Sequence, residues 1–273
     1  MEIRIPLGAA LAILLSASAL HAQESTDGPN APPPRPPEGS RIVNLPSAEV
    51  PRAQTLTLLF THRFTQPVQD SDIHSLYSFD SGALIGIGLA YTLIENLEVS
   101  LYRSSNLDDY ELDAKYRVLT RGPFTLSLRA GENWRTESIG LETRDGFFAQ
   151  AIAGFSIGSR VRVTVVPTFV SRTPGQRFVA SRDRVFNVPA AISIAVNRTI
   201  NVQGEIVPRN GRADSPGAGW IASIEKTVVR HRFAFTVGNL RATTVDQYVA
   251  SDFSGLSPKS YFFGFNLVRQ WKL

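Results

Sequence analysis

The chain has 273 residues, a formal net charge of +4 and no cysteine. The absence of cysteine excludes disulfides, thiolate catalysis, iron–sulfur clusters and covalently attached haem. The basic residues alternate along amphipathic segments and do not form the concentrated positive stripe that is typical of nucleic-acid binding. The sequence therefore predicts no nucleic-acid partner, and it indicates no cofactor.

The N-terminus has the pattern of an export signal. Arg4 precedes an apolar run over residues 5–19, and small residues follow, with cleavage expected after Ala22 or Ala19. The alternative is a membrane-spanning helix, but the run is shorter than the roughly 20 apolar residues that a span needs. Residues 1–22 are therefore predicted to be a cleaved secretory signal peptide.

A proline-rich stretch follows the signal. Residues 24–38 contain six prolines among Asp, Asn and Gly. Proline fixes φ and lacks the N–H group that helices and sheets need. Residues 23–53 are therefore predicted to be an extended periplasmic tether, and a proline-rich motif that binds a periplasmic partner is the alternative.

From residue 54 onward the dominant hydrophobic period is two, which is typical of β-strands. Residues 110–118 show it most clearly, because every residue on one face of that segment is charged. The predicted strands are 54–65, 85–93, 97–103, 110–118, 124–133, 147–157, 161–171, 186–197, 200–207, 219–226, 229–237 and 261–273.

The predicted connections alternate in length. The short links are 94–96, 120–123, 158–160, 198–199 and 227–228, and the longer ones are 65–82, 104–109, 135–146, 172–184, 208–218 and 238–259. Bacterial barrels have an even number of strands, short periplasmic turns and long extracellular loops. A soluble β-sandwich, the alternative, has no reason to sort its loops in this way. The chain is therefore predicted to be all-β: a closed antiparallel up-and-down outer-membrane β-barrel of about 12 strands over residues 54–273.

The last predicted strand is expected to close the barrel by pairing with residues 54–65, which leaves no edge unpaired in lipid. Arg269 interrupts its apolar face and is expected near the periplasmic rim, where a long side chain reaches the headgroups. The remaining residues of this face resemble the signal that the outer-membrane assembly machinery reads: Tyr261, Phe263, Phe265, Leu267, Trp271 and Leu273.

Strand parity directs polar side chains of both signs into the lumen. They are interpreted either as the lining of a narrow polar pore or as paired charges that plug the barrel. The predicted lumen-facing residues are Arg63, Glu111, Asp113, Lys115, Arg117, Arg129, Gln150, Arg162, Glu205, Glu225, Arg230 and Arg232. The basic loop residues expected to bind anionic lipopolysaccharide are Arg172, Arg177, Arg182 and Arg184.

Candidate catalytic and metal-binding residues are few. A membrane-embedded hydrolase needs a nucleophilic serine beside a histidine, and the mature chain offers His62, His74 and His231. His62 and His231 are predicted to face lipid near strand ends, in an aromatic belt. His74 shares a loop with Asp70 and Asp72, which is either a metal site or a hydrated loop, and the usual composition of turns favours the hydrated loop. The sequence therefore assigns no catalytic residue and no metal site.

Two further features are interpreted structurally. Gly86 and Gly88 lie in the middle of a predicted strand, where small inward residues relieve crowding, so they are not read as a phosphate-binding loop. Pro167 and Pro189 fall inside predicted strands and are expected to mark kinks or bulges in the wall.

Several short runs resemble those of one family. They are Val43-Asn44-Leu45-Pro46, Thr61-His62-Arg63-Phe64, Leu101-Tyr102-Arg103-Ser104, Asp108-Asp109-Tyr110-Glu111-Leu112, Asn187-Val188-Pro189, Asp246-Gln247-Tyr248 and Gly264-Phe265-Asn266. Together they resemble the β-barrel family called domain of unknown function 5777, over nearly everything after the proline-rich stretch. The resemblance implies an outer-membrane barrel of a Gram-negative bacterium and brings no activity, ligand or catalytic residue.

Three functions from different classes are compatible with these observations. The preferred one is a narrow passive channel or transport barrel for small polar solutes, with an open lumen. The second is a structural or partner-binding barrel with a plugged lumen. The third is a membrane-embedded hydrolase, which requires a reachable nucleophile beside one of the histidines.

Overall fold

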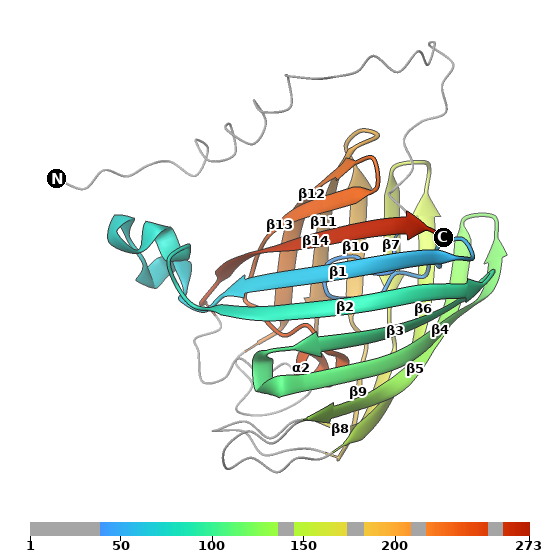
Figure 1. Cartoon of the computed structure of the whole chain (residues 1–273), viewed down its shortest axis with the longest axis horizontal. Coiled ribbons are helices and arrows are strands. Elements are labelled where there is room, and N and C mark those ends of the chain that lie inside the picture. Colours follow the sequence, from blue (N-terminus) through green and yellow to red (C-terminus); the bar gives the residue numbers. More distant parts are fainter. Residues whose placement is uncertain (1–38, 136–144, 174–182, 209–216, 251–258) are drawn as a thin grey trace. The chain divides into compact units, whose positions relative to one another are not determined.

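The computed structural model describes residues 39–135, 145–173, 183–208, 217–250 and 259–273. One antiparallel sheet closes on itself into a barrel (Figure 1). The predicted signal peptide, residues 23–38 of the predicted tether, and the loop residues Arg177 and Arg182 lie outside the described residues. Among the residues that are described, no helix is long and apolar enough to cross a membrane.

The strands follow one another around the wall in chain order, as in an up-and-down barrel. They are β1 (Thr55–Phe64), β2 (Ala83–Ile94), β3 (Leu97–Ser104), β4 (Asp109–Arg121), β5 (Phe124–Arg135), β6 (Gly146–Ile157), β7 (Val161–Val165), β8 (Thr168–Arg172), β9 (Asp183–Asn187), β10 (Ala190–Ala195), β11 (Ile200–Val207), β12 (Gly219–Val228), β13 (His231–Gly238) and β14 (Phe262–Lys272).

Two strands of the wall are each split by a proline. β6 pairs with both β7 and β8, while β10 pairs with β7 and β9 pairs with β8. Pro167 and Pro189 stand at the breaks, because a residue without an N–H group cannot continue the ladder. Bonding persists across the gap, since the amide of Val166 donates to the carbonyl of Pro189 at 2.8 Å. The predicted barrel of 12 strands is therefore confirmed.

β1 and β14 close the barrel, as predicted. Their antiparallel register runs from Thr55 opposite Lys272 to Arg63 opposite Gly264. Arg269 points outward near one rim, where it lies opposite His231, the first residue of β13. Its guanidinium donates to His231 Nε2 at 2.8 Å and lies 4.9 Å from the centre of the Trp271 ring. The charge is therefore held by partners close to the end of the wall.

The connections are sorted by length between the two ends of the barrel. The tight turns after β2, β4, β6, β10 and β12 lie at the end where β1 begins and β14 finishes, which we call the short-turn end. There the amide of Leu273 donates to the carbonyl of Gln54 at 2.9 Å. The longer connections lie at the opposite, long-loop end. The alternation expected for a bacterial barrel is thus present in the fold.

Arg230 corrects one lumen assignment. It was expected on a strand over residues 229–237, but β13 begins only at His231. Val229 has a φ of 54° and is 91% exposed, so it forms the turn after β12. Arg230 shares this turn and is exposed at the short-turn end. A left-handed residue ends the extended backbone, and strand parity therefore does not apply to Arg230.

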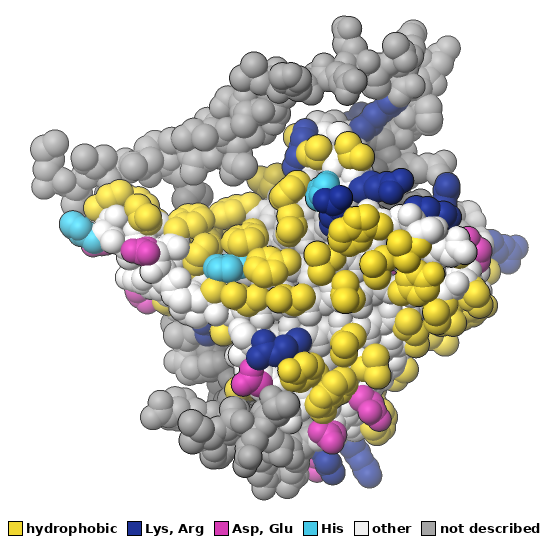
Figure 2. Space-filling view, in the orientation of Figure 1, with side chains coloured by type: hydrophobic (Ala, Val, Ile, Leu, Met, Phe, Trp, Pro, Cys, Tyr) yellow, Lys and Arg dark blue, Asp and Glu magenta, His cyan; other side chains and the backbone are white. Residues whose placement is uncertain are grey.

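Side chains of the wall alternate between the lumen and the outer surface. On β4, Glu111 and Asp113 are buried inside while Leu112 is exposed outside. The outer surface is rich in hydrophobic side chains (Figure 2). Ile87 and Phe186, for example, are 53% and 63% exposed. An apolar outer wall of this kind is suited to contact with lipid.

Gly86 and Gly88 of β2 leave room for Tyr102 inside the barrel, in agreement with the predicted relief of crowding. A Cβ atom at Gly86 would lie 1.8 Å from Tyr102 Oη, and one at Gly88 would lie 2.6 Å from Tyr102 Cδ2. Tyr102 Oη also forms a hydrogen bond of 2.7 Å with Thr61 Oγ1. The glycines therefore hold this ring against the inner wall.

Gly86→Ala is expected to destabilise the barrel by about 1–3 kcal/mol, because the added methyl displaces the Tyr102 ring. Gly204→Ala is the matched control, since its Cβ would have its nearest neighbour, Ile192 Cγ2, at 3.7 Å. Urea unfolding of the protein refolded into lipid vesicles measures both variants. A Gly86→Ala variant as stable as wild type would contradict the crowding argument.

Candidate functional site in the barrel lumen

Two chain segments fill the lumen from opposite ends. The N-terminal plug, residues 39–50, precedes β1 at the short-turn end, and the loop plug, residues 239–250, follows β13 at the long-loop end. The loop plug includes the helix α2 (Val245–Val249), which Figure 1 shows behind the wall formed by β3, β4 and β5. Every residue of both plugs is buried or half-buried.

The N-terminal plug changes the interpretation of residues 39–50, which the sequence assigned to an extended tether. Ile42, Val43 and Leu45 are apolar and buried, and a solvated tether would leave them in water. The plug forms a tight turn in which the amide of Ile42 donates to the carbonyl of Leu45 at 2.9 Å. A second bond, from the amide of Ser47 to the carbonyl of Ser40, closes this turn at 3.0 Å.

Glu205 of β11 binds the tip of this turn. Its Oε1 atom accepts the backbone N–H groups of Val43, Asn44 and Leu45 at 2.7, 3.0 and 3.0 Å. Three successive amides that converge on one point form an anion-binding concavity, and here the anion is a carboxylate of the wall. Glu205 therefore fixes the N-terminal plug through its backbone.

Arg63 of β1 and Asn266 of β14 hold the same turn from another part of the wall, three to four strands away from β11. Arg63 Nη2 donates to Asn44 Oδ1 at 2.8 Å, and Arg63 Nη1 donates to Asn266 Oδ1 at 2.8 Å. Asn266 Nδ2 in turn donates to the carbonyl of Val43 at 2.9 Å. The closing pair of strands thus contributes directly to plug binding.

Ion pairs hold the N-terminal plug nearer the short-turn end. Glu49 carries the acidic group, which lies 2.7 Å from Arg162 Nη1 and 3.6 Å from Arg117 Nη1. Lys115 Nζ donates to the carbonyl of Glu49 at 2.8 Å and lies 3.3 Å from Glu98 Oε1. The plug is therefore held by polar contacts along its length.

Glu111 of β4 connects the two plugs. Its Oε1 atom accepts from Arg41 of the N-terminal plug at 2.9 Å and from Arg129 of the wall at 2.5 Å. Its Oε2 atom accepts the backbone N–H group of Val245 in the loop plug at 2.8 Å. Arg41 also donates to the carbonyl of Thr243 at 3.0 Å. One buried carboxylate thus contacts both segments that fill the lumen.

The loop plug is bound to the wall by polar side chains. Asp109 Oδ2 accepts from Thr244 Oγ1 at 2.6 Å and from Gln247 Nε2 at 2.7 Å. Arg135 forms a close ion pair with Asp246. Burial raises the pKa of Asp246, and the positive charge of Arg135 opposes that rise.

An apolar cluster fills the part of the lumen between the plugs and one side of the wall. Both plugs and six strands contribute to it. Its members are Ile42, Val43, Leu45, Phe148, Val170, Val185, Ala191, Val207, Ile221, Leu240, Ala242, Val245, Tyr248 and Val249. Burial of this surface removes water from the lumen and stabilises the filled state.

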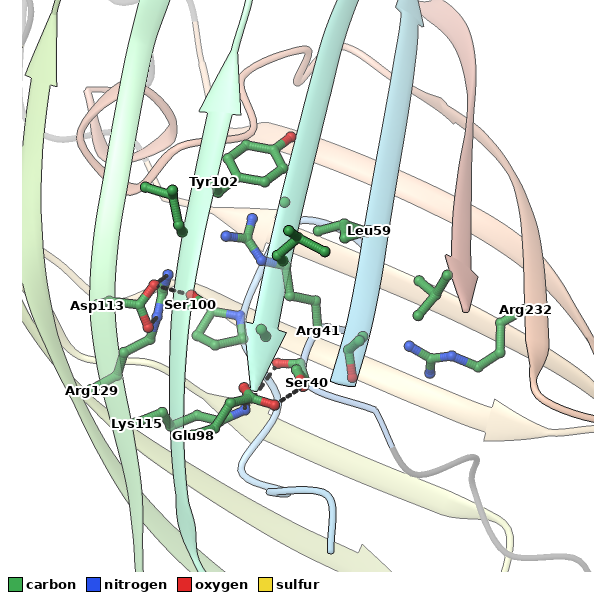
Figure 3. A pocket seen from close by; sticks show the side chains of 17 residues that line it. Ser40, Arg41, Leu59, Glu98, Ser100, Tyr102, Asp113, Lys115, Arg129 and Arg232 are labelled. Carbon is green, nitrogen blue, oxygen red and sulfur yellow. Dashed lines mark hydrogen bonds and ion pairs between the residues drawn. The ribbon is translucent and has the colours of Figure 1, made fainter. Parts of the chain in front are cut away.

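The N-terminal plug also borders a small cavity of about 40 Å³, which is lined by charged and by apolar side chains. In Figure 3, Arg41 extends beneath Tyr102, while Ser40, Glu98 and Lys115 meet at the base of the cavity. Arg41 lies 4.5 Å from the centre of the Tyr102 ring. A water molecule needs at least roughly 10–15 Å³, so this cavity has room for a few waters.

The structure brings most of the predicted lumen-facing residues into the barrel. Arg63, Glu111, Asp113, Lys115, Arg129, Gln150, Glu205, Glu225 and Arg232 are buried inside it. Arg117 and Arg162 are half-buried and hold Glu49, and Arg230 is the exception described above.

The sequence pattern did not place the plug residues in the lumen, among them Arg41, Asn44 and Glu49. One signal was present, because Ile42, Val43 and Leu45 form an apolar group directly after a proline-rich polar stretch. A second signal was the length of the connection after β13, which the loop plug accounts for.

The three histidines have different surroundings. His62 faces outward and stacks on Phe265 with ring centres 4.7 Å apart, while His231 accepts from Arg269. The backbone N–H group of His74 donates to Asp72 Oδ1 at 2.9 Å, so this carboxylate caps a turn. Within the described ranges, no three acidic or histidine side chains gather as a metal site.

The fold is similar to those of solved outer-membrane proteins. The NanC porin has a TM-score of 0.50 and 8% identity, with 80% of this chain and 100% of the porin covered. An outer-membrane channel from Pseudomonas putida F1 has a TM-score of 0.48 and 13% identity, with 81% and 97% covered. The outer membrane phospholipase A from Escherichia coli has a TM-score of 0.45 and 13% identity, with 79% and 90% covered.

At 8% identity, the similarity to the NanC porin shows the fold alone. No curated protein matches the sequence significantly. A family model described as a membrane bound beta barrel domain matches residues 38–271, which include both plugs and all but the last residue of the barrel wall. The chain therefore belongs to this family of membrane-bound β-barrels, the domain of unknown function 5777 family.

Proposed function

We propose that this protein is an outer-membrane channel for small polar solutes that its own N-terminal plug holds closed. The observation that supports it is the polar attachment of the plug. The wall side chains Glu205, Arg63 and Lys115 bind backbone or amide groups of the plug. When the plug moves, water molecules can form these hydrogen bonds in place of the plug groups. The wall that remains would present charged side chains of both signs to a solute.

A permanently open passive channel is less well supported than a gated one. The lumen contains both plugs, and the cavity beside the N-terminal plug has a volume of only about 40 Å³. Passage of a solute therefore requires movement of a plug. The N-terminal plug is the better candidate, because it is joined to the barrel on one side only, through β1, and its other end continues into residues 1–38.

A sealed structural barrel is the second candidate, and the apolar cluster favours it. Ile42, Val43 and Leu45 of the N-terminal plug pack in this cluster together with Val245 and Val249 of the loop plug. Withdrawal of the plug would expose these side chains to water. The two candidates therefore differ in whether the N-terminal plug can leave the lumen in the folded protein.

A reversible disulfide across the plug tests this difference. A Cβ atom built on Gly154 of β6 would lie 3.1 Å from the Cβ atom of Ala48 in the plug. Disulfide-bonded cysteines have Cβ atoms roughly 3.5–4.5 Å apart, so a small adjustment permits the bond. Because the chain has no cysteine, the double variant Ala48→Cys/Gly154→Cys contains only the designed pair.

We expect planar-bilayer recordings of wild type to show a closed barrel with rare openings. The oxidised double variant should show none, and reduction should restore them. Deletion of residues 39–50 should give steady, discrete conductance, and Gly154→Cys alone is the control for the substitution. A folded deletion variant that stays silent would overturn the channel proposal and favour the sealed barrel.

A further inference from the structure

The connection between β1 and β2 carries an exposed apolar cluster at the long-loop end. It contains the short helices η2 (Val68–Asp70) and η3 (Ile73–Ser78) and projects from the wall in Figure 1. Within it, Ile73, Leu76 and Phe79 are 57%, 56% and 47% exposed. We call residues 72–79 the projecting segment. Exposed apolar clusters of this kind mark interaction surfaces.

The exposed apolar side chains of the projecting segment are continuous with the outer wall of the barrel. The ring of Phe79 lies 5.0 Å from that of Phe64, 5.5 Å from that of Phe263 and 6.3 Å from that of Phe235. Phe235 and Phe263 lie on neighbouring strands, with ring centres 5.2 Å apart. In Figure 2, hydrophobic side chains gather on the projecting segment as well as on the wall beside it.

The projecting segment has a defined backbone shape. Leu76 and Tyr77 have φ values of 47° and 54°, in the left-handed region that large side chains rarely adopt. The amide of Tyr77 donates to the carbonyl of Asp72 at 2.8 Å, and the side chains of Asp72 and Ser75 form a capping box. Unfavourable backbone angles that are held by specific bonds often serve a function.

Polar residues of the same connection are exposed beside the apolar side chains of the projecting segment. Asp70, Asp72, His74 and Asp80 are all exposed. The connection therefore presents apolar and charged groups close together, as segments at a membrane–water boundary do. A loop that extends freely into water would gain nothing from exposing Ile73 and Leu76.

We propose that the projecting segment inserts its apolar side chains into the boundary between headgroups and acyl chains at the long-loop end of the barrel. The occupant of this surface is lipid, because Phe79 joins the segment to a wall that faces lipid. The acidic side chains and His74 then lie on the water side. The segment thus anchors the rim of the barrel in one leaflet, independently of what passes through the lumen.

Single cysteines placed in this chain without cysteine provide the test. Leu76→Cys and the matched control Asp70→Cys are each labelled with an environment-sensitive nitrobenzoxadiazole fluorophore. The proteins are refolded into phosphatidylcholine vesicles that contain phosphatidylcholine with a nitroxide near the headgroup. Both positions are exposed on the protein, so neither label disturbs the barrel interior.

The label at position 76 should emit at shorter wavelength than the label at position 70 and should be quenched by the nitroxide lipid. It should also be quenched at least about threefold less by aqueous iodide, since such segments lie ~5–10 Å into the boundary. Equal iodide quenching at the two positions, without lipid quenching, would overturn the proposal. Protection at position 76 that disappears when the protein is diluted in lipid would identify a second copy of the chain as the occupant, and would also overturn it.

Discussion

Replacement of Arg129 by methionine is expected to destabilise the barrel by about 3–5 kcal/mol, the usual cost of breaking a buried ion pair. Arg129 is the central cation of the lumen: Nε donates to Asp113 Oδ1 at 2.7 Å and Nη2 donates to Asp113 Oδ2 at 2.6 Å. Its Nη2 atom also contacts Glu111, and Nη1 donates to Gln150 Oε1 at 3.0 Å. Methionine fills much of the space but leaves Asp113 without its main counter-charge.

Urea unfolding in lipid vesicles, followed by tryptophan fluorescence, measures this loss. Arg103→Met is the matched control, because Arg103 pairs with Asp108 at 2.5 Å while both side chains are more than 40% exposed. Exposed pairs typically contribute about 0–1 kcal/mol, so the control should be close to wild type. Similar midpoints for the two variants would show that the lumen network does not stabilise the barrel.

Glu205→Gln is expected to lower the free energy of release of the N-terminal plug by about 1–3 kcal/mol. This corresponds to a factor of roughly 5–150 in the equilibrium between bound and released plug. The carboxylate accepts three backbone N–H groups of the plug, and the neutral amide lacks its charge and one of its two acceptor oxygens. The wall and the apolar cluster stay unchanged, so the barrel should remain folded.

The reaction rate of a buried thiol reports release of the plug. Ala48 is fully buried, so a cysteine at this position (Ala48→Cys) should react slowly with a maleimide in the otherwise wild-type protein. In the double variant Ala48→Cys/Glu205→Gln the reaction should be faster by the same factor of roughly 5–150. Glu225→Gln is the control, because Glu225 is equally buried but pairs with Arg232 of the neighbouring strand. The same acceleration in both variants would mean that the Glu205 contacts do not hold the plug.

The inner face of the barrel could be predicted from the sequence because strand parity is local. Glu111, Asp113 and Lys115 alternate with Leu112 and its outward neighbours, and this pattern alone places the charges on one face. The limits of a strand are less certain. Arg230 was wrongly assigned to the lumen because Val229, with a positive φ value, begins a turn there. The alternation of residue types does not reveal this turn.

The sequence by itself determined the closed barrel of 12 strands, its apolar outer face, the sorting of its loops and the pairing of β14 with β1. These features depend on periodicity and on contacts between strands that follow one another, or that must meet to leave no unpaired edge in lipid. Only the tertiary structure decided what occupies the lumen. Val43 binds Glu205 across a separation of 162 positions, and Arg41 binds Glu111 across 70. Such contacts have no period along the chain, since they depend on which loop or terminus folds back into the barrel.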